Sequence, residues 1–185
     1  MKRLLVAPLA FFALVWAVAP NYYPHEVGMR WLYTSGEEQV LEEVRSMDGQ
    51  EVWVLSHSYG GTVRYTDFLR YGDEGVWLLA VDTGAGPMPY DPPILLWPKP
   101  PLRVGQNWSV RTTLKGTPLV VVYKVLKVEG VEVPAGRFNA FVVRSSLSAQ
   151  GGGASVVDLY FVPGIGVVRY ATQDGGQIDL QKFTP

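Results

Sequence analysis

One stretch of the sequence has the residue types of a serine nucleophile. Residues 54–61 read Val-Leu-Ser-His-Ser-Tyr-Gly-Gly, close to the Gly-x-Ser-x-Gly pattern that holds a reactive serine on a sharp turn between a strand and a helix. Such a serine needs a neighbouring histidine that accepts its proton. The chain has two histidines, His25 and His57, and both precede Ser58.

The stretch resembles the nucleophile elbow of the α/β-hydrolases, and that resemblance implies a serine hydrolase with Ser58 as its nucleophile. Three observations disfavour this function. Ser56 replaces the first glycine, no histidine follows the serine as that fold requires, and no strand–helix alternation surrounds the motif. If residues 51–59 form a strand, His57 and Ser58 also point to opposite faces. We expect a strand that ends in a glycine hairpin, with no catalytic residue.

Metal and cofactor chemistry finds little support in the sequence. With no cysteine and two histidines, the usual zinc ligand sets cannot form. The aspartates stand singly in predicted turns, and no calcium-loop motif occurs. The paired acids Glu37-Glu38 and Glu42-Glu43 are typical of a solvated face rather than of acid–base catalysis. We expect no metal, no cofactor and no enzymatic activity.

Aromatic side chains are the remaining candidates for a function. Tryptophan and tyrosine occur mostly at predicted strand positions, where they either fill a core or line an apolar groove for a lipid, glycan or peptide. The sequence leaves both interpretations open. If a groove exists, the residues expected to line it are Trp53, Trp77, Trp97 and Tyr90.

Strands must position these side chains, because no segment of residues 20–185 predicts a convincing helix. Apolar runs separated by glycine, proline and Asp-Gly turns predict sequential antiparallel strands. Residues 37–47 are ambiguous, since their glutamates favour a helix, but the matching stretch 118–125 is strongly β-branched, so we interpret both as strands. Residues 177–182 alternate cleanly, which predicts a strand near a sheet edge.

Residues 83–101 are different in composition. Their prolines and glycines predict a stiff connector rather than a strand. The apolar residues in the stretch, which include Tyr90 and Trp97, indicate that it packs on the rest of the domain.

A short pattern occurs twice and suggests two similar halves. Residues 24–31 and 101–108 both read Pro-x-x-Val-Gly-x-x-Trp. Two weaker matches follow in the same order. Residues 44–52 match residues 125–133, and Asp67 precedes a Gly-Val pair by the same interval as Asp158 does. We therefore expect half-repeats at about residues 22–98 and 99–185.

The predicted fold is a single all-β domain over residues 20–185. About ten strands would form an antiparallel meander, shaped as a curved sheet, a half-open barrel or a sandwich of the two halves. The length of 185 residues and the 48% hydrophobic content allow one domain with a substantial core. A net charge of -1 gives no reason to expect nucleic-acid binding.

The N-terminus predicts export. In residues 1–19, Lys2 and Arg3 precede an apolar run that ends in small residues, which is typical of a signal peptide or an uncleaved anchor. The protein is expected to be periplasmic, secreted or anchored at the outer face of the inner membrane. Membrane contact is expected through this segment alone.

Two further stretches resemble a set of exported bacterial β-rich proteins of unknown function. Residues 131–140 fit the pattern Val-x-Val-Pro-Ala-Gly-x-Phe of that set, and residues 158–168 fit its Pro-Gly-Ile/Val-Gly-x-Val strand. Such proteins look distantly like the half-open barrels of lipoprotein carriers. The resemblance implies a curved antiparallel sheet with an apolar concavity, and it brings no catalytic residues.

The sequence favours a non-enzymatic exported protein that binds a lipid, or another apolar or extended ligand, on a concave sheet. The alternative is a structural or partner-binding module of the cell envelope, whose edge strands pair with an envelope protein. A serine hydrolase at Ser58 is the least favoured function.

Overall fold

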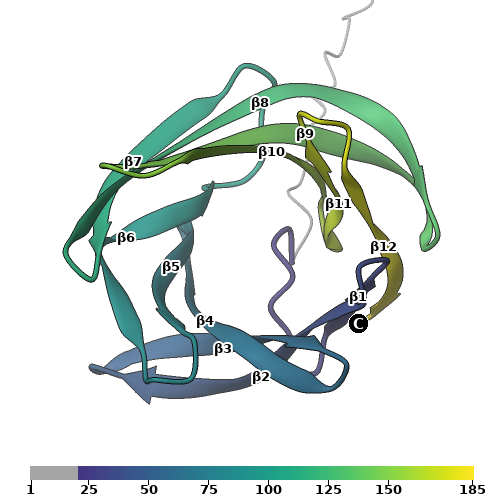
Figure 1. Ribbon diagram of the computed structural model, residues 1–185. Coiled ribbons are helices and arrows are strands. Elements are labelled where there is room, and N and C mark those ends of the chain that lie inside the picture. Colours follow the sequence, from purple (N-terminus) through teal and green to yellow (C-terminus); the bar gives the residue numbers. More distant parts are fainter. Residues whose placement is uncertain (1–20) are drawn as a thin grey trace, which may run out of the picture.

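The computed structural model describes residues 21–185, which form a closed barrel of twelve antiparallel strands (Figure 1). The predicted export segment, residues 1–19, lies outside the described residues. In chain order the strands are β1 (Arg30–Tyr33), β2 (Glu37–Met47), β3 (Gln50–Tyr59), β4 (Thr62–Gly72), β5 (Gly75–Asp82), β6 (Met88–Pro98), β7 (Asn107–Leu114), β8 (Thr117–Val133), β9 (Gly136–Ala149), β10 (Ala154–Val162), β11 (Gly166–Thr172) and β12 (Gln177–Thr184). No helix within residues 21–185 is long and apolar enough to cross a membrane.

The predicted all-β antiparallel meander is confirmed, but the predicted strand number and open shape are wrong. The strands number twelve rather than about ten, and the sheet is neither a half-open barrel nor a sandwich. It closes because β1 pairs on both sides: Arg30 is opposite Val40 of β2 and also opposite Thr184 of β12. Figure 1 shows the resulting ring of strands.

Closure also overturns the expectation that residues 177–182 lie near a sheet edge. Ile178 of β12 is opposite Tyr170 of β11, and Phe183 is opposite Trp31 of β1. The clean alternation of this strand has another cause. A barrel wall has one face toward the interior and one toward solvent, so it produces the same pattern as a half-solvated edge strand.

The proline-rich stretch is a strand rather than a connector, because β6 changes its partner at the prolines. Met88 and Pro89 pair with β5, whereas Tyr90 and Asp91 pair with Leu114 and Thr113 of β7. Residues 94–98 then return to β5. Proline lacks an amide proton and is tolerated where the ladder is interrupted.

Strands β6 and β7 are paired through the backbone at two residue positions only, and side-chain hydrogen bonds add to this pairing. The indole Nε1 of Trp108 donates a hydrogen bond to the carbonyl of Leu95 at 3.0 Å. The hydroxyl of Thr112 donates to the carbonyl of Pro92 at 2.6 Å. These bonds satisfy carbonyls of β6 that have no ladder partner on this side.

Residues 37–47 form strand β2, as predicted from their match to the β-branched residues 118–125. Glu37, Gln39 and Leu41 are buried at alternate positions. Burial of this face against the barrel interior outweighs the helix propensity of the glutamates, which is worth only tenths of a kcal/mol per residue.

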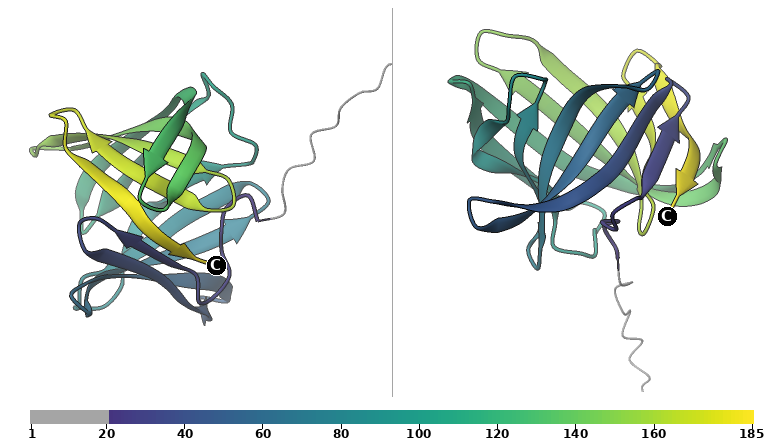
Figure 2. Two further views of the ribbon diagram at one scale, coloured as in Figure 1. Left: turned by 90° about the vertical axis from the view of Figure 1, so that its right-hand side faces the viewer. Right: turned by 90° about the horizontal axis from the view of Figure 1, so that it is seen from below.

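The N-terminal segment, residues 21–29, lies at one end of the barrel (Figure 2). The rings of Tyr22 and Tyr23 are buried in a core cluster that also contains Val125 and Phe161. The hydroxyl of Tyr22 accepts a hydrogen bond from the amide of Leu102 at 3.0 Å. The two tyrosine rings therefore fill part of the barrel interior at this end.

Three further hydrogen bonds hold the segment in place from different walls. The hydroxyl of Tyr23 donates to the carbonyl of Pro98 at 2.6 Å. Trp53 of β3 donates to the carbonyl of His25 at 2.8 Å, and Tyr71 of β4 donates to the carbonyl of Pro24 at 3.1 Å. Long-range bonds of this kind fix an irregular segment that has no ladder of its own.

The two Pro-x-x-Val-Gly-x-x-Trp stretches make the same backbone hydrogen bonds. Gly28 donates to the carbonyl of Leu41 at 2.8 Å, and Gly105 donates to that of Val125 at 2.9 Å. Leu41 and Val125 each donate back to the residue after the glycine, at 3.0 and 2.9 Å. Each pair of strands, β2 with β3 and β8 with β9, shifts register directly after these residues.

The second matched block of the sequence does not correspond in the structure. Gly49 lies in the hairpin turn between β2 and β3, whereas Gly130 lies within β8. The expectation of two similar halves over the whole domain stays a prediction.

We predict that alanine at Gly28 or Gly105 destabilises the barrel through backbone strain. Both glycines have positive φ, 97° and 85°, and an added Cβ would meet nothing within 4 Å. Each substitution should lower the free energy of unfolding by about 1 kcal/mol or more. Urea denaturation would measure the loss.

The control for this prediction is Gly72→Ala, at a glycine without positive φ and with open space around its Cβ position. It should leave stability unchanged or raise it by up to about 1 kcal/mol. Equal effects at all three positions would contradict the strain account.

Candidate functional site

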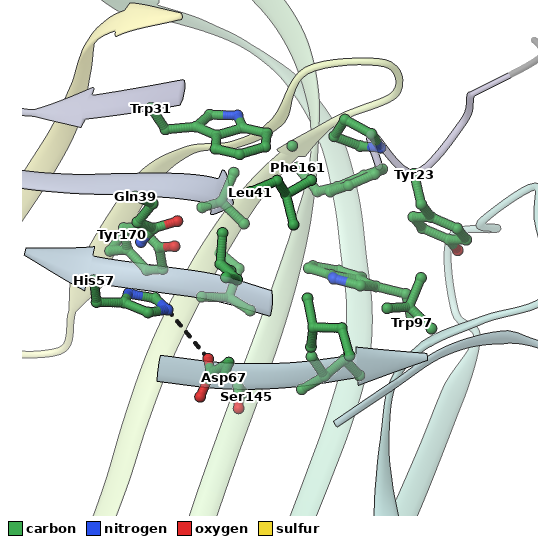
Figure 3. A pocket seen from close by; sticks show the side chains of 18 of the residues that line it. Tyr23, Trp31, Gln39, Leu41, His57, Asp67, Trp97, Ser145, Phe161 and Tyr170 are labelled. Carbon is green, nitrogen blue, oxygen red and sulfur yellow. Dashed lines mark hydrogen bonds and ion pairs between the residues drawn. The ribbon is translucent and has the colours of Figure 1, made fainter. Parts of the chain in front are cut away.

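A cavity of about 230 Å³ lies inside the barrel (Figure 3). Strands far apart in the sequence share its wall, with Leu41 from β2, Trp97 from β6 and Phe161 from β10. Aromatic and aliphatic side chains make up most of the lining. Polar side chains gather at one side, and the labelled ones are Gln39, His57, Asp67, Ser145 and Tyr170.

The apolar side of the cavity is an aromatic stack that rests on the N-terminal segment. The Trp97 and Phe161 ring centroids are 4.6 Å apart, and Tyr23 stacks on Trp97 at 6.2 Å. Figure 3 shows these three rings on the side away from His57. Aromatic rings prefer stacked and offset arrangements of this kind, and together the three rings form a continuous apolar surface.

A buried histidine lies between two carboxylates at the polar side. The Nδ1 atom of His57 is 2.8 Å from Oε1 of Glu37, and its Nε2 atom is 3.2 Å from Oδ2 of Asp67. The residues come from the neighbouring strands β3, β2 and β4. His57 is 5% exposed and Glu37 is 8% exposed, so water screens this arrangement poorly.

Both ring nitrogens of His57 lie within hydrogen-bond distance of a carboxylate oxygen, which favours the imidazolium, the form that donates from both nitrogens. Burial disfavours the charged ring, but the hydrogen bonds to Asp67 and Glu37 outweigh burial and raise the pKa of His57. Burial alone would raise the pKa of Glu37, because it disfavours the charged carboxylate. The hydrogen bonds from His57, Gln39 and Tyr59 prevail and lower the pKa of Glu37.

Neighbouring polar groups complete the network. The amide of Gln39 donates to Oε1 of Glu37 at 2.9 Å, and the hydroxyl of Tyr59 donates to Oε2 at 2.9 Å. The Tyr65 ring stacks on His57 with centroids 4.0 Å apart. Burial raises the pKa of Tyr170, which therefore presents a neutral hydroxyl.

The four aromatic residues predicted to line a groove lie in different places. Trp97 lines the cavity. Trp53 lines a second, more open cavity of about 470 Å³, which shares Tyr23, Tyr71 and Val76 with the first.

The other two candidates line neither of these cavities. Trp77 is opposite Arg70 in the β4–β5 ladder, and the Arg70 guanidinium lies 5.5 Å from the centre of its ring. Tyr90 packs against the core cluster that holds Tyr22 and Tyr23. The structure therefore brings Trp53 and Trp97 to the two sides of the N-terminal segment and leaves Trp77 and Tyr90 apart from them.

The serine motif has the geometry of a strand rather than of a nucleophile elbow. Ser58 donates from its hydroxyl to the backbone carbonyl of Glu38 at 3.3 Å. His57 meanwhile bonds to Glu37 and Asp67 in the interior. Successive residues of a strand point to opposite faces, so His57 cannot serve as the base for Ser58.

The sequence reasoning missed the histidine–carboxylate network because it placed Glu37-Glu38 on a solvated face. That interpretation is wrong for Glu37, which is buried, while the half-buried Glu38 forms an ion pair with Arg30 at 3.4 Å. The sequence did carry a signal for this burial, because in a strand Glu37 falls on the same face as the apolar Leu41. Within residues 21–185, no group of three or more histidine and acidic side chains could hold a metal ion.

We predict that stability falls as pH rises above neutrality, because His57 must lose its proton. A group whose pKa is raised in the folded state contributes fully below its usual pKa of 6.5 and loses that contribution as pH rises through the folded value. Glu37 has the opposite sign, with its contribution present above 4.5 and lost at lower pH. Stability from this network should therefore peak between these values, as measured by urea denaturation across the range.

Variants make the pH test specific. His57→Gln should remove the alkaline loss and cost about 3–5 kcal/mol at mildly acidic pH, because it leaves two carboxylates without their cation. Ser58→Ala, one residue away, should keep the wild-type pH dependence. A wild-type urea midpoint that stays flat from pH values below neutrality to alkaline pH would contradict the assignment.

We predict no ester hydrolysis at Ser58. The purified protein should turn over p-nitrophenyl esters no faster than Ser58→Ala does, since no base faces the hydroxyl. Turnover that disappears in Ser58→Ala would overturn this expectation.

No protein-family model matches the sequence, and no curated protein does. Two solved structures are similar to the chain. A candidate lipoprotein from Parabacteroides distasonis ATCC 8503 has 12% identity and a TM-score of 0.49, over 88% of this chain and 98% of the other. A candidate exported protein with a YmcC-like fold from Bacteroides fragilis NCTC 9343 has 13% identity and a TM-score of 0.49, over 90% of this chain and 100% of the other.

Proposed function

We propose that this protein is an exported, non-enzymatic binding protein that holds the apolar part of a small ligand inside its barrel. The observation that carries the proposal is the interior cavity of about 230 Å³ with its aromatic side. Binding pockets are mostly apolar and contain a few placed polar groups. The lining has this composition, with Trp97 and Phe161 at one side and His57 and Asp67 at the other.

The energetic cost of an empty cavity supports the proposal. Protein interiors are close-packed, with few voids larger than a water molecule. An unfilled apolar space of about 230 Å³ leaves its lining side chains without part of their dispersion contacts. A ligand that fills the space recovers dispersion contacts and removes its own apolar surface from water.

The size of the cavity limits the ligand. Pockets for drug-sized ligands are roughly 300–1,000 Å³, and this space is smaller. It suits a short alkyl or aromatic group rather than a whole membrane lipid. A larger apolar group would need the second cavity as well, which Tyr23 and the N-terminal segment separate from the first.

The alternative of an envelope module that pairs its edge strands with a partner has less support. Strand pairing of that kind needs an edge with free backbone groups. Within the described chain, each of the twelve strands has a neighbour on both sides.

Export rests on the sequence of residues 1–19. The described chain begins at the barrel end where residues 21–29 lie. If the segment stays uncleaved as an anchor, this end of the barrel faces the membrane surface.

The test of the proposed function is binding of a neutral apolar dye, N-phenyl-1-naphthylamine, with mass spectrometry of organic extracts of the natively purified protein. We expect saturable dye fluorescence and a co-purifying apolar compound. Leu96→Trp enlarges a side chain that lines the cavity and should weaken dye binding at least about tenfold, because overfilling excludes the ligand.

The matched control is Trp77→Phe, which changes an aromatic residue beside Arg70 that lines neither cavity. It should bind the dye like the wild type. A clean extract together with the absence of saturable binding would refute the proposed function.

A further inference from the structure

We infer that the cavity selects a ligand whose polar end is a primary amine, and that Asp67 receives the ammonium group. The inference rests on the proposed function and names the ligand class for the same cavity. It follows from which polar atoms at the polar side of the cavity already take part in a hydrogen bond, and from the charges of these groups.

Asp67 is the acidic residue that faces the cavity. It lies on β4 in phase with Leu69 and Tyr71, which also line the cavity. Its Oδ2 atom accepts the hydrogen bond from His57, drawn as a dashed line in Figure 3. Within residues 21–185 no donor reaches Oδ1, and the side chain is 20% exposed. One carboxylate oxygen is therefore open to a donor.

Glu37 cannot play this part, because the network uses both of its oxygens. Oε1 accepts from His57 and Gln39, and Oε2 accepts from Tyr59. Glu37 acts as a positioning residue instead. It shares the positive charge of His57, so the imidazolium does not neutralise Asp67 completely.

The ionised groups at this end sum to one negative charge, from two carboxylates and one imidazolium. The other polar residues that line the cavity are neutral, and they are Gln39, Ser145 and the tyrosines. No lysine or arginine lines it within the described chain. An ammonium group therefore finds an acceptor of opposite charge, whereas a carboxylate meets a like charge in a poorly screened interior.

The two ends of the cavity together define an amphipathic ligand. The amine lies against Asp67, and the alkyl or aromatic part lies against the stack of Trp97 and Phe161. Figure 3 shows Asp67 and Ser145 on the polar side and the rings of Trp97 and Tyr23 opposite them. Charge-assisted hydrogen bonds are about twice as strong as neutral ones. The head group of the ligand therefore decides which of several ligands with the same apolar part binds most tightly.

The experiment compares three probes of equal chain length: octylamine, octanol and octanoate. Each displaces N-phenyl-1-naphthylamine from the wild-type protein near neutral pH. We expect octylamine to bind at least about tenfold more tightly than octanoate, with octanol between them. Asp67→Asn should weaken octylamine about tenfold and leave octanol nearly unchanged. Glu74→Gln, at an acid whose side chain is 77% exposed, should change none of the three.

The outcomes separate the two proposals. Octanoate binding as tightly as octylamine to the wild type overturns the amine inference, whether or not Asp67→Asn folds. The proposed function survives if octanol still displaces the dye. Unchanged octylamine affinity in a folded Asp67→Asn protein also overturns the role of Asp67. If neither the dye nor any probe binds, the proposed function itself fails.

Discussion

The pairing of the first strand with the last is the constraint on which the rest of the structure depends. Once β1 joins β12, the meander has an enclosed interior. Barrel diameter grows with strand number, and about eight strands already give an interior that side chains just fill. Twelve strands leave a wider space, so this chain needs large aromatic residues and the segment of residues 21–29 to fill one end. The cavity is the part that these groups leave open.

Enclosure also explains why the polar residues form a network. A charged group inside a closed wall has little water, so it must find partners on neighbouring strands. Gln39 is directly opposite His57, which is opposite Tyr65, and Asp67 lies two positions further along β4. Three adjacent strands can thus bring an imidazolium between two carboxylates. The same adjacency leaves Asp67 with one free oxygen toward the cavity.

Much of the fold could be predicted from local patterns, and the part that could not depends on long-range pairing. The meander and the Asp48-Gly49 hairpin follow from turn residues and alternation. The strand at residues 37–47 follows from its match to the β-branched residues 118–125. Closure of the barrel could not be predicted from the sequence, because side chains alternate between two faces with the same period in a barrel wall and in an open sheet. Strand β6 was missed because its prolines tolerate a change of partner that no local pattern reveals. Of the site, Trp97 was a predicted lining residue. His57 was weighed against Ser58, its neighbour in sequence, rather than against Glu37 and Asp67, its neighbours in the barrel.

A crystal structure of the protein under xenon pressure tests the central claim most directly, because apolar cavities stay dry and take up xenon or small apolar ligands. The account predicts xenon, or density for a retained ligand, between Trp97, Phe161 and Leu41 inside the barrel. Side chains that fill this space, or ordered water throughout it with no xenon site, would contradict the account.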